Sequence, residues 1–340
     1  MLKVGLIGLG FMGRGHLENY ARLEKEGAPV KLVAVCDIEP GRLEGRDIVT
    51  GNIGVGNSVD LSGYKKYTSY DEMLKKEQLD YVDIALPTYL HAEAAVAAMK
   101  AGCHVLCEKP MARSVQECEQ MIDTARSTGK KLMTAQCLRF WPAYEFLKDC
   151  VDSGKFGPVV SAYFFRGGGT PTWSWDGWLL DAPRSGGCLL DQHIHDVDMI
   201  NWLFGAPDAV SANAMNVVKG SGYDAVSARY MYADGKVVCA EDDWTINGGF
   251  GFDMVFRVNF KKGSVHFGHG KVMAYPVEGD GFEPELPADN GYYREICYFI
   301  DCVLNDRPIE TCAPESTRNT IAIATAEQES ADRGGVLVKL

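Results

Sequence analysis

The chain has 340 residues, more than one hydrophobic core usually serves, so the sequence predicts two domains. Apolar residues make up 46% and charged residues 24% of the chain, a composition typical of a globular protein that folds throughout. The formal net charge is -12 and there is no run of lysine and arginine, which argues against a nucleic-acid partner.

The N-terminal segment and the cysteines both argue against export and against a membrane. The apolar stretch around Leu6 is interrupted by Gly8, Gly10 and Arg14, so it is too short and too glycine-rich for a signal peptide or a membrane span. The 11 cysteines contain no Cys-x-x-Cys pair, which favours reduced, buried thiols over a disulfide framework. We therefore expect a cytoplasmic protein with no membrane partner.

Residues 1–137 alternate short apolar runs with helical stretches, a pattern that predicts a parallel sheet covered by helices on both faces. Ser114 and Glu117 form a capping box that begins a helix ending near Gly129, and Gly102 ends the helix before it. We predict an α/β domain with a doubly wound Rossmann sheet over 1–137. Its expected strands lie at residues 4–7, 32–35, 81–86, 104–106 and 131–133.

A glycine-rich turn follows the first predicted strand. Gly8, Gly10 and Gly13 fit a G-x-G-x-x-G pattern, in which glycine lets the pyrophosphate of a dinucleotide approach backbone N–H groups at a helix N-terminus. The next strand ends in Asp37, where a carboxylate can bind the ribose hydroxyls and repel a 2'-phosphate. The pattern predicts NAD rather than NADP, and Arg42, which could turn towards a phosphate, weakens the prediction only slightly.

One stretch departs from the alternation of strands and helices. Residues 47–66 contain six glycines and asparagines, too many for a helix or a central strand. We predict a surface loop there, either a lid over the cofactor or a plain excursion. The plain excursion is favoured, because long surface loops are tolerated at low cost.

A lysine lies just beyond the predicted strand 104–106, in the run Cys107-Glu108-Lys109-Pro110. Ligands collect at the carboxyl ends of strands in open α/β sheets, and a lysine there can stabilise the alkoxide that develops as hydride leaves. The alternative is an ordinary exposed lysine before a proline, and position alone does not decide between them. Pro110 would fix this turn and could have a cis peptide.

From about residue 158 the pattern changes to β runs joined by tight turns. Residues 225–232 and 236–241 flank the turn Ala233-Asp234-Gly235, and residues 252–260 and 264–267 flank Lys261-Lys262-Gly263. We predict a C-terminal α+β domain over 138–340 with a mostly antiparallel open sheet. Helices are expected at 292–304 and 314–332.

A second polar constellation lies in residues 185–205, whose apolar period and terminal Gly205 predict a helix. If that helix begins by Asp191, then Asp191 and His195 are four residues apart on one face and can contact the same substrate. A helix N-terminus would keep the His195 imidazole neutral and ready to accept a proton. Asp191 would orient the ring or hold a neighbouring hydroxyl, and His193 is expected to pack.

A zinc site is the competing interpretation of this segment, which contains several ligand types: Cys188, Asp191, His193 and His195. On a helix, however, Asp191 and His193 point in different directions. His266-x-x-His269 lies in a predicted hairpin without an obvious cysteine or carboxylate partner. We therefore predict no metal centre.

Three tryptophans precede this segment, at positions 173, 175 and 178. Tryptophan faces suit the apolar faces of sugar rings, although aromatics in a loop can simply pack against a sheet. We expect at least one of them, Trp178, to line the substrate site. Arg166, Asp176 and Tyr293 are further candidates for substrate hydroxyls, whereas Arg139 is more typical of a structural residue.

With these residues in place, the sequence resembles the glucose-fructose oxidoreductase, inositol dehydrogenase and rhizopine catabolism family, usually written Gfo/Idh/MocA, over nearly the whole chain. The combination of the Glu-Lys-Pro motif with Gly-Gly-x-x-x-Asp-x-x-x-His is specific. The likeness rests on these stretches: Gly8–Gly13 with Asp37, Ala85-Leu86-Pro87-Thr88 with His91, Ala101–Pro110, Arg139-Phe140-Trp141-Pro142, and Gly186-Gly187 to Asp191, His195 and Asp198.

The resemblance implies that Lys109 and His195 face the nicotinamide ring and the substrate carbon, with Asp191 beside them. It implies that the second domain's open sheet supports the substrate site and a homodimer or homotetramer interface. His193 stands where the family often has a small residue, so it is expected to narrow the pocket or add a polar contact. The expected cofactor-binding residues are Gly8, Gly10, Phe11, Met12, Gly13, Asp37, Pro87, Thr88, His91, Glu108 and Lys109.

The expected function is hydride transfer between NAD and a hydroxyl-bearing carbon of a sugar, inositol or related polyol. NAD would bind the first domain and the substrate the crevice between the domains, where His195 accepts the hydroxyl proton and Lys109 stabilises the alkoxide. Two alternatives stay open: a redox-assisted glycoside hydrolase or lyase that holds NAD, and a non-catalytic NAD-sensing protein. The presence of both Lys109 and His195 counts against the second, and the fold does not identify the sugar.

Overall fold

The structure is a computed structural model that describes residues 1–45, 49–51, 54–56, 59–246 and 248–340. It divides into two compact units, and two segments of the C-terminal half pack with the N-terminal one. The first unit contains Met1–Cys137, Trp173–Asp176 and Tyr292–Arg318. The second unit contains Leu138–Thr172, Gly177–Gly291 and Asn319–Leu340.

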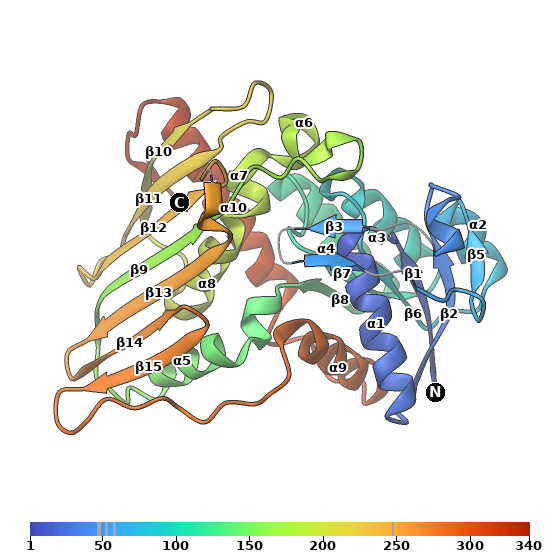
Figure 1. Cartoon of the computed structure of the whole chain (residues 1–340), viewed down its shortest axis with the longest axis horizontal. Helices are drawn as coiled ribbons and strands as arrows, with labels where there is room; N and C mark the ends of the chain where they lie inside the picture. The colour runs from blue at the N-terminus through green and yellow to red at the C-terminus, as the bar shows by residue number, and fades with distance from the viewer. Residues whose placement is uncertain (46–48, 52–53, 57–58, 247) are drawn as a thin grey trace. The chain divides into compact units, whose positions relative to one another are not determined.

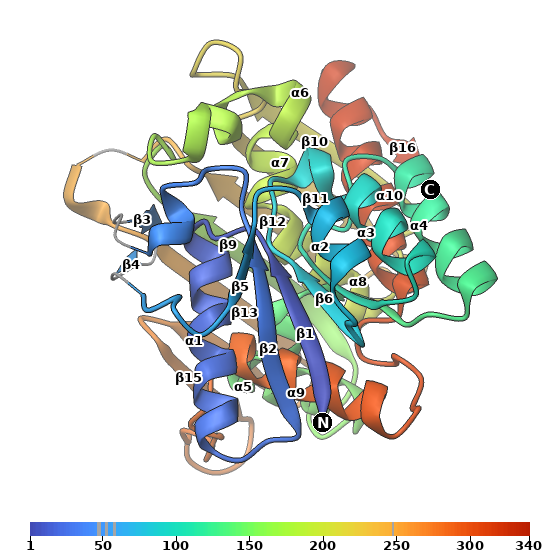
Figure 2. The same ribbon diagram turned by 90° about the vertical axis from the view of Figure 1, so that its right-hand side faces the viewer.

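The first unit contains a six-stranded parallel sheet in the order β5-β2-β1-β6-β7-β8, which confirms the predicted Rossmann sheet. Figure 2 shows β5, β2, β1 and β6 side by side in this order. The strand order reverses between β1 and β6, and ligands of open α/β sheets bind beyond the carboxyl ends of strands at such a point. The strands are β1 (Leu2–Ile7), β2 (Val30–Cys36), β5 (Lys65–Tyr67), β6 (Tyr81–Ile84), β7 (His104–Glu108) and β8 (Leu132–Ala135).

Helices cover this sheet, and one of them comes from the C-terminal half. The predicted capping box is present: Ser114 Oγ accepts the Glu117 N–H at 3.2 Å, and Gly129 ends the helix in the left-handed region. The ring of Phe299 lies 5.2 Å from that of Tyr81, which places α9 (Gly291–Leu304) against β6. The helices are α1 (Phe11–Lys25), α2 (Tyr70–Lys76), α3 (His91–Lys100), α4 (Val115–Thr128) and α9 (Gly291–Leu304), with short helices η1 (Arg42–Glu44) and η2 (Thr88–Leu90).

The glycine-rich stretch 47–66 is not a loop throughout, so that prediction is wrong in part. β3 (Val49–Gly51) and β4 (Gly54–Gly56) form a two-stranded antiparallel sheet, and β5 begins at Lys65. Glycine weakens a strand without forbidding one, and here two short strands pair only with each other in the described part of the chain. Residues 59–64 form loop and turn, as predicted, and residues 47–48, 52–53 and 57–58 of the stretch lie outside the described residues.

The second unit contains an eight-stranded sheet in the order β15-β14-β13-β9-β12-β11-β10-β16. All neighbours are antiparallel except β9 and β12, which confirms the mostly antiparallel prediction. The parallel pair arises because helices, rather than a tight turn, follow β9. The strands are β9 (Val159–Gly167), β10 (Ala209–Met215), β11 (Ala225–Met231), β12 (Val237–Asp243), β13 (Asp253–Phe260), β14 (Gly263–Gly268), β15 (Lys271–Pro276) and β16 (Val338–Lys339).

Helices pack on one face of this sheet (Figure 1), where alternate strand residues such as Phe164 and Phe256 are buried. The ring of Tyr144, on α5, lies 5.0 Å from that of Phe256 and 5.9 Å from that of Phe267. Within the described residues, no helix combines the length and apolar character needed to cross a membrane. The helices are α5 (Pro142–Asp152), α6 (Ala182–Ser185), α7 (Gly187–Asp191), α8 (Ile194–Phe204) and α10 (Pro314–Asp332), with η3 (Cys137–Phe140), η4 (Trp175–Leu180) and η5 (Gly248–Phe250).

The single helix predicted over residues 185–205 is wrong, because α7 and α8 are separate. The carbonyl of Cys188 accepts the N–H groups of both Gln192 at 2.9 Å and His193 at 2.8 Å, which interrupts the regular helical ladder. Gly186 and Gly187 begin the segment in the left-handed region, with φ of 79° and 72°. The two short helices therefore join at Gln192 and His193.

Candidate active site

The turn between β1 and α1 needs glycine for two different reasons. A Cβ on Gly8 would collide with the Ala85 carbonyl, and one on Gly13 with the Gly8 carbonyl, so a side chain would push α1 away from β1 and β6. A Cβ on Gly10 would meet only Arg42 Nη1, at 3.9 Å, among the described atoms. Gly10 is also the N-cap of α1 and makes no side-chain capping bond. The first turn of α1, including Phe11 and Met12, therefore forms an open cradle that suits a phosphate.

Asp37 lies beside this cradle and is only 4% exposed. Its Oδ2 accepts the Leu9 N–H at 2.8 Å, and its Oδ1 accepts the Glu39 N–H at 2.9 Å. Arg42 Nη1 lies 3.3 Å from Asp37 Oδ2. The arginine that could have bound a 2'-phosphate is therefore paired with the carboxylate, an arrangement that suits the ribose of NAD.

Lys109 follows β7, is half-buried, and precedes Pro110 through a cis peptide. Glu108 Oε2 accepts the Lys109 N–H at 3.0 Å. The His91 ring lies 2.8 Å from both the Pro110 and Leu86 carbonyl oxygens, and burial lowers its pKa. Of the expected cofactor ligands after β6, Thr88 and His91 are thus buried and support the loops, whereas Pro87 is partly exposed.

A buried polar network that sequence reasoning missed lies behind Lys109. His16 Nδ1, on α1, is 2.8 Å from Asp83 Oδ2, and His16 Nε2 is 3.0 Å from Glu108 Oε1. Tyr20 donates to the same Asp83 oxygen at 2.8 Å. Burial acts to lower the pKa of His16, but Asp83 and Glu108 outweigh it and raise that pKa well above its ordinary value. An aspartate inside the apolar run 81–86 was the available signal.

Glu295, on α9, lies beside this network, and both of its carboxylate oxygens are buried without a hydrogen-bond partner in the described part of the chain. Ligand atoms of His16, Glu108 and Glu295 lie within 4.8 Å of one another, a separation that a metal site would also have. Both His16 nitrogens already contact Asp83 and Glu108, so hydrogen bonds account for those two carboxylates but not for Glu295. Burial and the nearby Glu108 raise the pKa of Glu295 well above its ordinary value. The predicted zinc alternative at Asp191, His193 and His195 does not form such a group in the described part of the chain.

Asp191 and His195 are the accessible residues of a segment that is otherwise buried. Asp191 ends α7 and His195 lies in the first turn of α8. Every other residue from Gly187 to Asn201 is buried, whereas these two are partly exposed. The break between α7 and α8 therefore leaves two polar side chains open to a ligand, one a carboxylate and one an imidazole.

His193, between them, is fully buried in the second unit, so it does not narrow a surface pocket as the family comparison had suggested. Its Nδ1 lies 2.8 Å from Asp242 Oδ2 on β12, and its Nε2 lies 3.3 Å from Glu327 Oε2 on α10. Burial acts to lower the pKa of His193, but Glu327 and Asp242 outweigh it and raise that pKa to about 10. His193 thus holds the junction of α7 and α8 to the core.

Arg166 and Arg139 both form buried ion pairs. Arg166 is 3% exposed, and its Nε and Nη2 donate to Asp196 at 3.3 and 3.2 Å. With these donors committed inside the core, Arg166 supports β9 and does not present its guanidinium to a substrate, contrary to expectation. Arg139 donates to both oxygens of Asp198, at 2.8 and 2.7 Å, as expected of a structural residue.

The remaining substrate candidates lie in different units. Tyr293 is in the first unit, where it donates to Glu26 and packs under the Arg22 guanidinium, 3.8 Å from its ring centroid. Asp176 also belongs to the first unit and is exposed. Trp178 is partly exposed and belongs to the second unit, which also contains Asp191 and His195.

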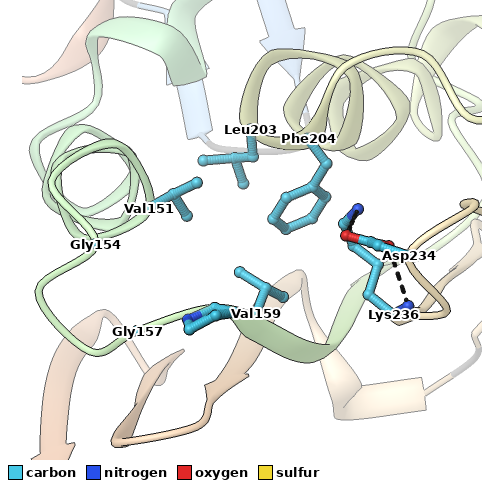
Figure 3. Close-up of a pocket in the computed structure, with 9 residues that line it drawn as sticks. Val151, Gly154, Gly157, Val159, Leu203, Phe204, Asp234 and Lys236 are labelled. Carbon is cyan, nitrogen blue, oxygen red and sulfur yellow. Dashed lines mark hydrogen bonds and ion pairs between the residues drawn. The ribbon is translucent and has the colours of Figure 1, made fainter.

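A hollow of about 580 Å³ opens on the second unit, away from His195 (Figure 3). Leu203 and Phe204 line it at the C-terminal end of α8, whereas His195 lies in the first turn of that helix. Leu203 is eight positions after His195, which is a rise of about 12 Å along the helix. Lys236 Nζ is paired with Asp234 at 2.8 Å on its wall. The hollow is therefore separate from the candidate active site.

Known proteins share both the sequence and the fold of this chain. Levoglucosan dehydrogenase from Pseudarthrobacter phenanthrenivorans is 33% identical over 219 residues, which are 62% of this chain and 53% of that protein. The 2,7-anhydro-N-acetylneuraminate hydratase of Mediterraneibacter gnavus is 28% identical over 213 residues, 62% of this chain and 53% of the relative. The chain spans about half the length of the curated relatives it matches.

A solved structure of levoglucosan dehydrogenase in complex with NADH and levoglucosan has a TM-score of 0.86, with 22% identity and 99% of both chains covered, which shows a shared fold. Two family models match the sequence directly. Residues 2–136 match the oxidoreductase family with an NAD-binding Rossmann fold, and residues 144–266 match the GFO/IDH/MocA C-terminal domain. The glycine cradle and Asp37 fit NAD, and the chain belongs to the Gfo/Idh/MocA family of oxidoreductases.

Proposed function

We propose that the protein transfers a hydride between NAD and a hydroxyl-bearing carbon of a sugar, inositol or related polyol. The observation that carries this proposal is the accessible pair Asp191 and His195 in an otherwise buried segment. An accessible carboxylate and an accessible imidazole on the same segment suit removal of a proton from a carbinol. A relative named levoglucosan dehydrogenase supports a carbohydrate-like substrate.

Different residues of the chain have different roles in the proposed reaction. Gly10, the first turn of α1 and Asp37 hold the dinucleotide, which supplies the hydride acceptor or donor when bound. The His195 imidazole accepts the hydroxyl proton and Asp191 orients that ring or a neighbouring hydroxyl. The Lys109 ammonium stabilises the alkoxide oxygen as negative charge develops on it. Trp178 contributes an apolar face to the substrate ring.

In this proposal residues 1–137, with the two segments that pack with them, form the cofactor domain, and the rest of residues 138–340 form the substrate and assembly domain. Exposed side chains alternate with buried ones on the sheet of the second unit, among them Arg229, Glu241 and Arg257. This face supports assembly into a homodimer or homotetramer. The cytoplasm is the compartment proposed, since all 11 cysteines are free thiols and all but Cys239 and Cys297 are buried.

Substitution of the two reacting side chains tests the reaction. Lys109→Ala and His195→Ala should each keep NAD affinity within about threefold and lower kcat by about 100-fold or more, because each removes a transition-state interaction. A thermal-shift screen of polyols, aldoses, inositols and amino sugars with NAD identifies the substrate, and NADH formation measures turnover. Lys25→Ala, at the exposed C-terminal end of α1, is the control. Normal turnover in both active-site variants would contradict the assignment.

A relative named a hydratase favours a second candidate function, redox-assisted hydrolysis or elimination on a glycoside. In that reaction NAD oxidises the sugar transiently and is regenerated within one cycle, with no net change in its redox state. The turnover assay distinguishes the two: product without net NADH selects this second candidate. A non-catalytic NAD-sensing protein, the remaining alternative, would show neither product nor a loss of function in the Lys109 and His195 variants.

A further inference from the structure

Four residues from the middle of the chain, Trp173–Asp176, pack with the first unit. They follow β9, a strand of the second unit, and precede α6 and α7 of that same unit. The flanking residues Thr172 and Gly177 belong to the second unit, so these four residues interrupt that unit's stretch 138–291. Two of its four residues are tryptophans, and both indoles are only partly buried.

Trp173 contacts the residue that follows the glycine cradle. Its ring centroid lies 6.3 Å from that of Phe11, at an interplanar angle of 54°. Phe11 is the first residue of α1, and its ring also lies against β3, where a Cβ on Gly51 would come within 2.5 Å of it. Phe11 therefore lies between β3 and Trp173. Trp173 is thereby fixed beside the first turn of α1, where the phosphates of a dinucleotide belong.

Trp175 contacts the residues that follow β2. Its Nε1–H donates to Glu39 Oε1 at 3.2 Å, and the Arg42 guanidinium lies 5.9 Å from its ring centroid. Arg42 is in turn paired with Asp37, the carboxylate placed to bind the ribose. One tryptophan is thus beside the phosphate cradle and the other beside the ribose carboxylate.

We propose that Trp173 and Trp175 form a clamp on the adenosine-pyrophosphate half of the dinucleotide. Both indoles have uncovered surface next to the residues that fit this half, and aromatic faces stack on nucleobases and riboses. The clamp slows release of the cofactor, so NAD stays bound through turnover. The tryptophan-rich segment is therefore divided by function: Trp173 and Trp175 act on the cofactor, and Trp178, in the second unit, is left for the substrate. This inference rests on NAD binding and not on the proposed hydride transfer.

Binding of ADP-ribose tests the clamp directly, because this fragment contains the adenosine and both phosphates but no nicotinamide. Trp173→Ala and Trp175→Ala should each raise the Kd of ADP-ribose and of NADH by about tenfold or more, mainly through faster dissociation. Calorimetry gives the Kd values, and stopped-flow NADH fluorescence gives the dissociation rates. Trp178→Ala is the matched control and should keep the Kd of ADP-ribose within about twofold.

Two milder variants separate loss of the clamp from loss of the fold. Trp175→Phe keeps an aromatic face and should raise both Kd values less than Trp175→Ala does. Glu39 is exposed, so Glu39→Ala removes the acceptor of the indole N–H without disturbing the core, and should raise them about threefold. The clamp is refuted if ADP-ribose binds Trp173→Ala, Trp175→Ala, Trp175→Phe and Glu39→Ala as tightly as it binds the parent protein. Unchanged ADP-ribose binding with a raised KM for the sugar would instead assign these indoles to the substrate.

Discussion

Each unit buries one histidine between two carboxylates, but the two histidines are connected differently to the proposed catalytic groups. In the first unit His16 lies between Asp83 and Glu108, and Glu108 accepts the backbone N–H of Lys109. His16 is thus connected to Lys109 only through Glu108. Its network supports a turn at the end of a strand and leaves the Lys109 side chain half-buried and open to a ligand.

In the second unit the histidine is part of the segment that contains the proposed catalytic residues. His193 lies two residues after Asp191 and two before His195, and its partners Asp242 and Glu327 come from β12 and α10. A buried ion pair costs much of its attraction in desolvation, but removing one partner leaves the other charge buried and uncompensated. We infer that these networks serve mainly to fix the position of neighbouring reactive side chains.

The largest effect is expected when the buried, positively charged His193 of the second unit is replaced. His193→Leu would leave Asp242 and Glu327 buried without a counter-charge and should lower the free energy of unfolding by about 3–5 kcal/mol. Urea unfolding followed by tryptophan fluorescence measures this change. The matched control is His266→Leu on β14, where the histidine is partly exposed and the loss should be below about 1 kcal/mol. Equal losses in the two variants would contradict a special role for the buried network.

A smaller effect, measured on the rate, is expected in the first unit. Glu108→Ala removes the acceptor of the Lys109 N–H and should lower kcat by about 10- to 100-fold, because a displaced reactive group loses alignment. Glu108→Gln keeps an oxygen that can accept this N–H, so it should recover most of the rate. If Ala and Gln at position 108 give the same kcat, Glu108 does not position Lys109.

Local chain geometry explains what the sequence could predict. The glycine turn, Asp37 and Lys109 each follow from a motif at a strand end. Asp191 and His195 were predicted on one face of a single helix, but Asp191 ends α7 and His195 lies in α8. That Lys109 and His195 act on one substrate stays a prediction.

The features that could not be predicted from the sequence depend on contacts between residues that are distant along the chain. In the sequence Asp83 is only a polar residue inside an apolar strand, and its partner His16 comes from α1. Glu295, which lies near His16 and Glu108, comes from α9, more than half the chain away. The sequence groups Trp173 and Trp175 with Trp178 because the three lie within six residues of one another. Only packing shows that they belong to the other unit.

The smallest expected effect is the pH dependence of stability in the second unit. The pKa of His193 rises from 6.5 to about 10 on folding, so the stability it contributes is fully present below about pH 6.5 and is lost as the pH rises towards 10. The raised pKa of Asp242, about 7, acts in the same direction from its ordinary 3.8 upward. The second unit, followed through its buried Trp244, should therefore unfold more easily at about pH 9 than at about pH 7. His193→Leu should reduce this slope, because the titrating imidazole is gone, whereas His266→Leu should leave it unchanged. An equally steep slope without His193 would show that other groups dominate the alkaline loss of stability.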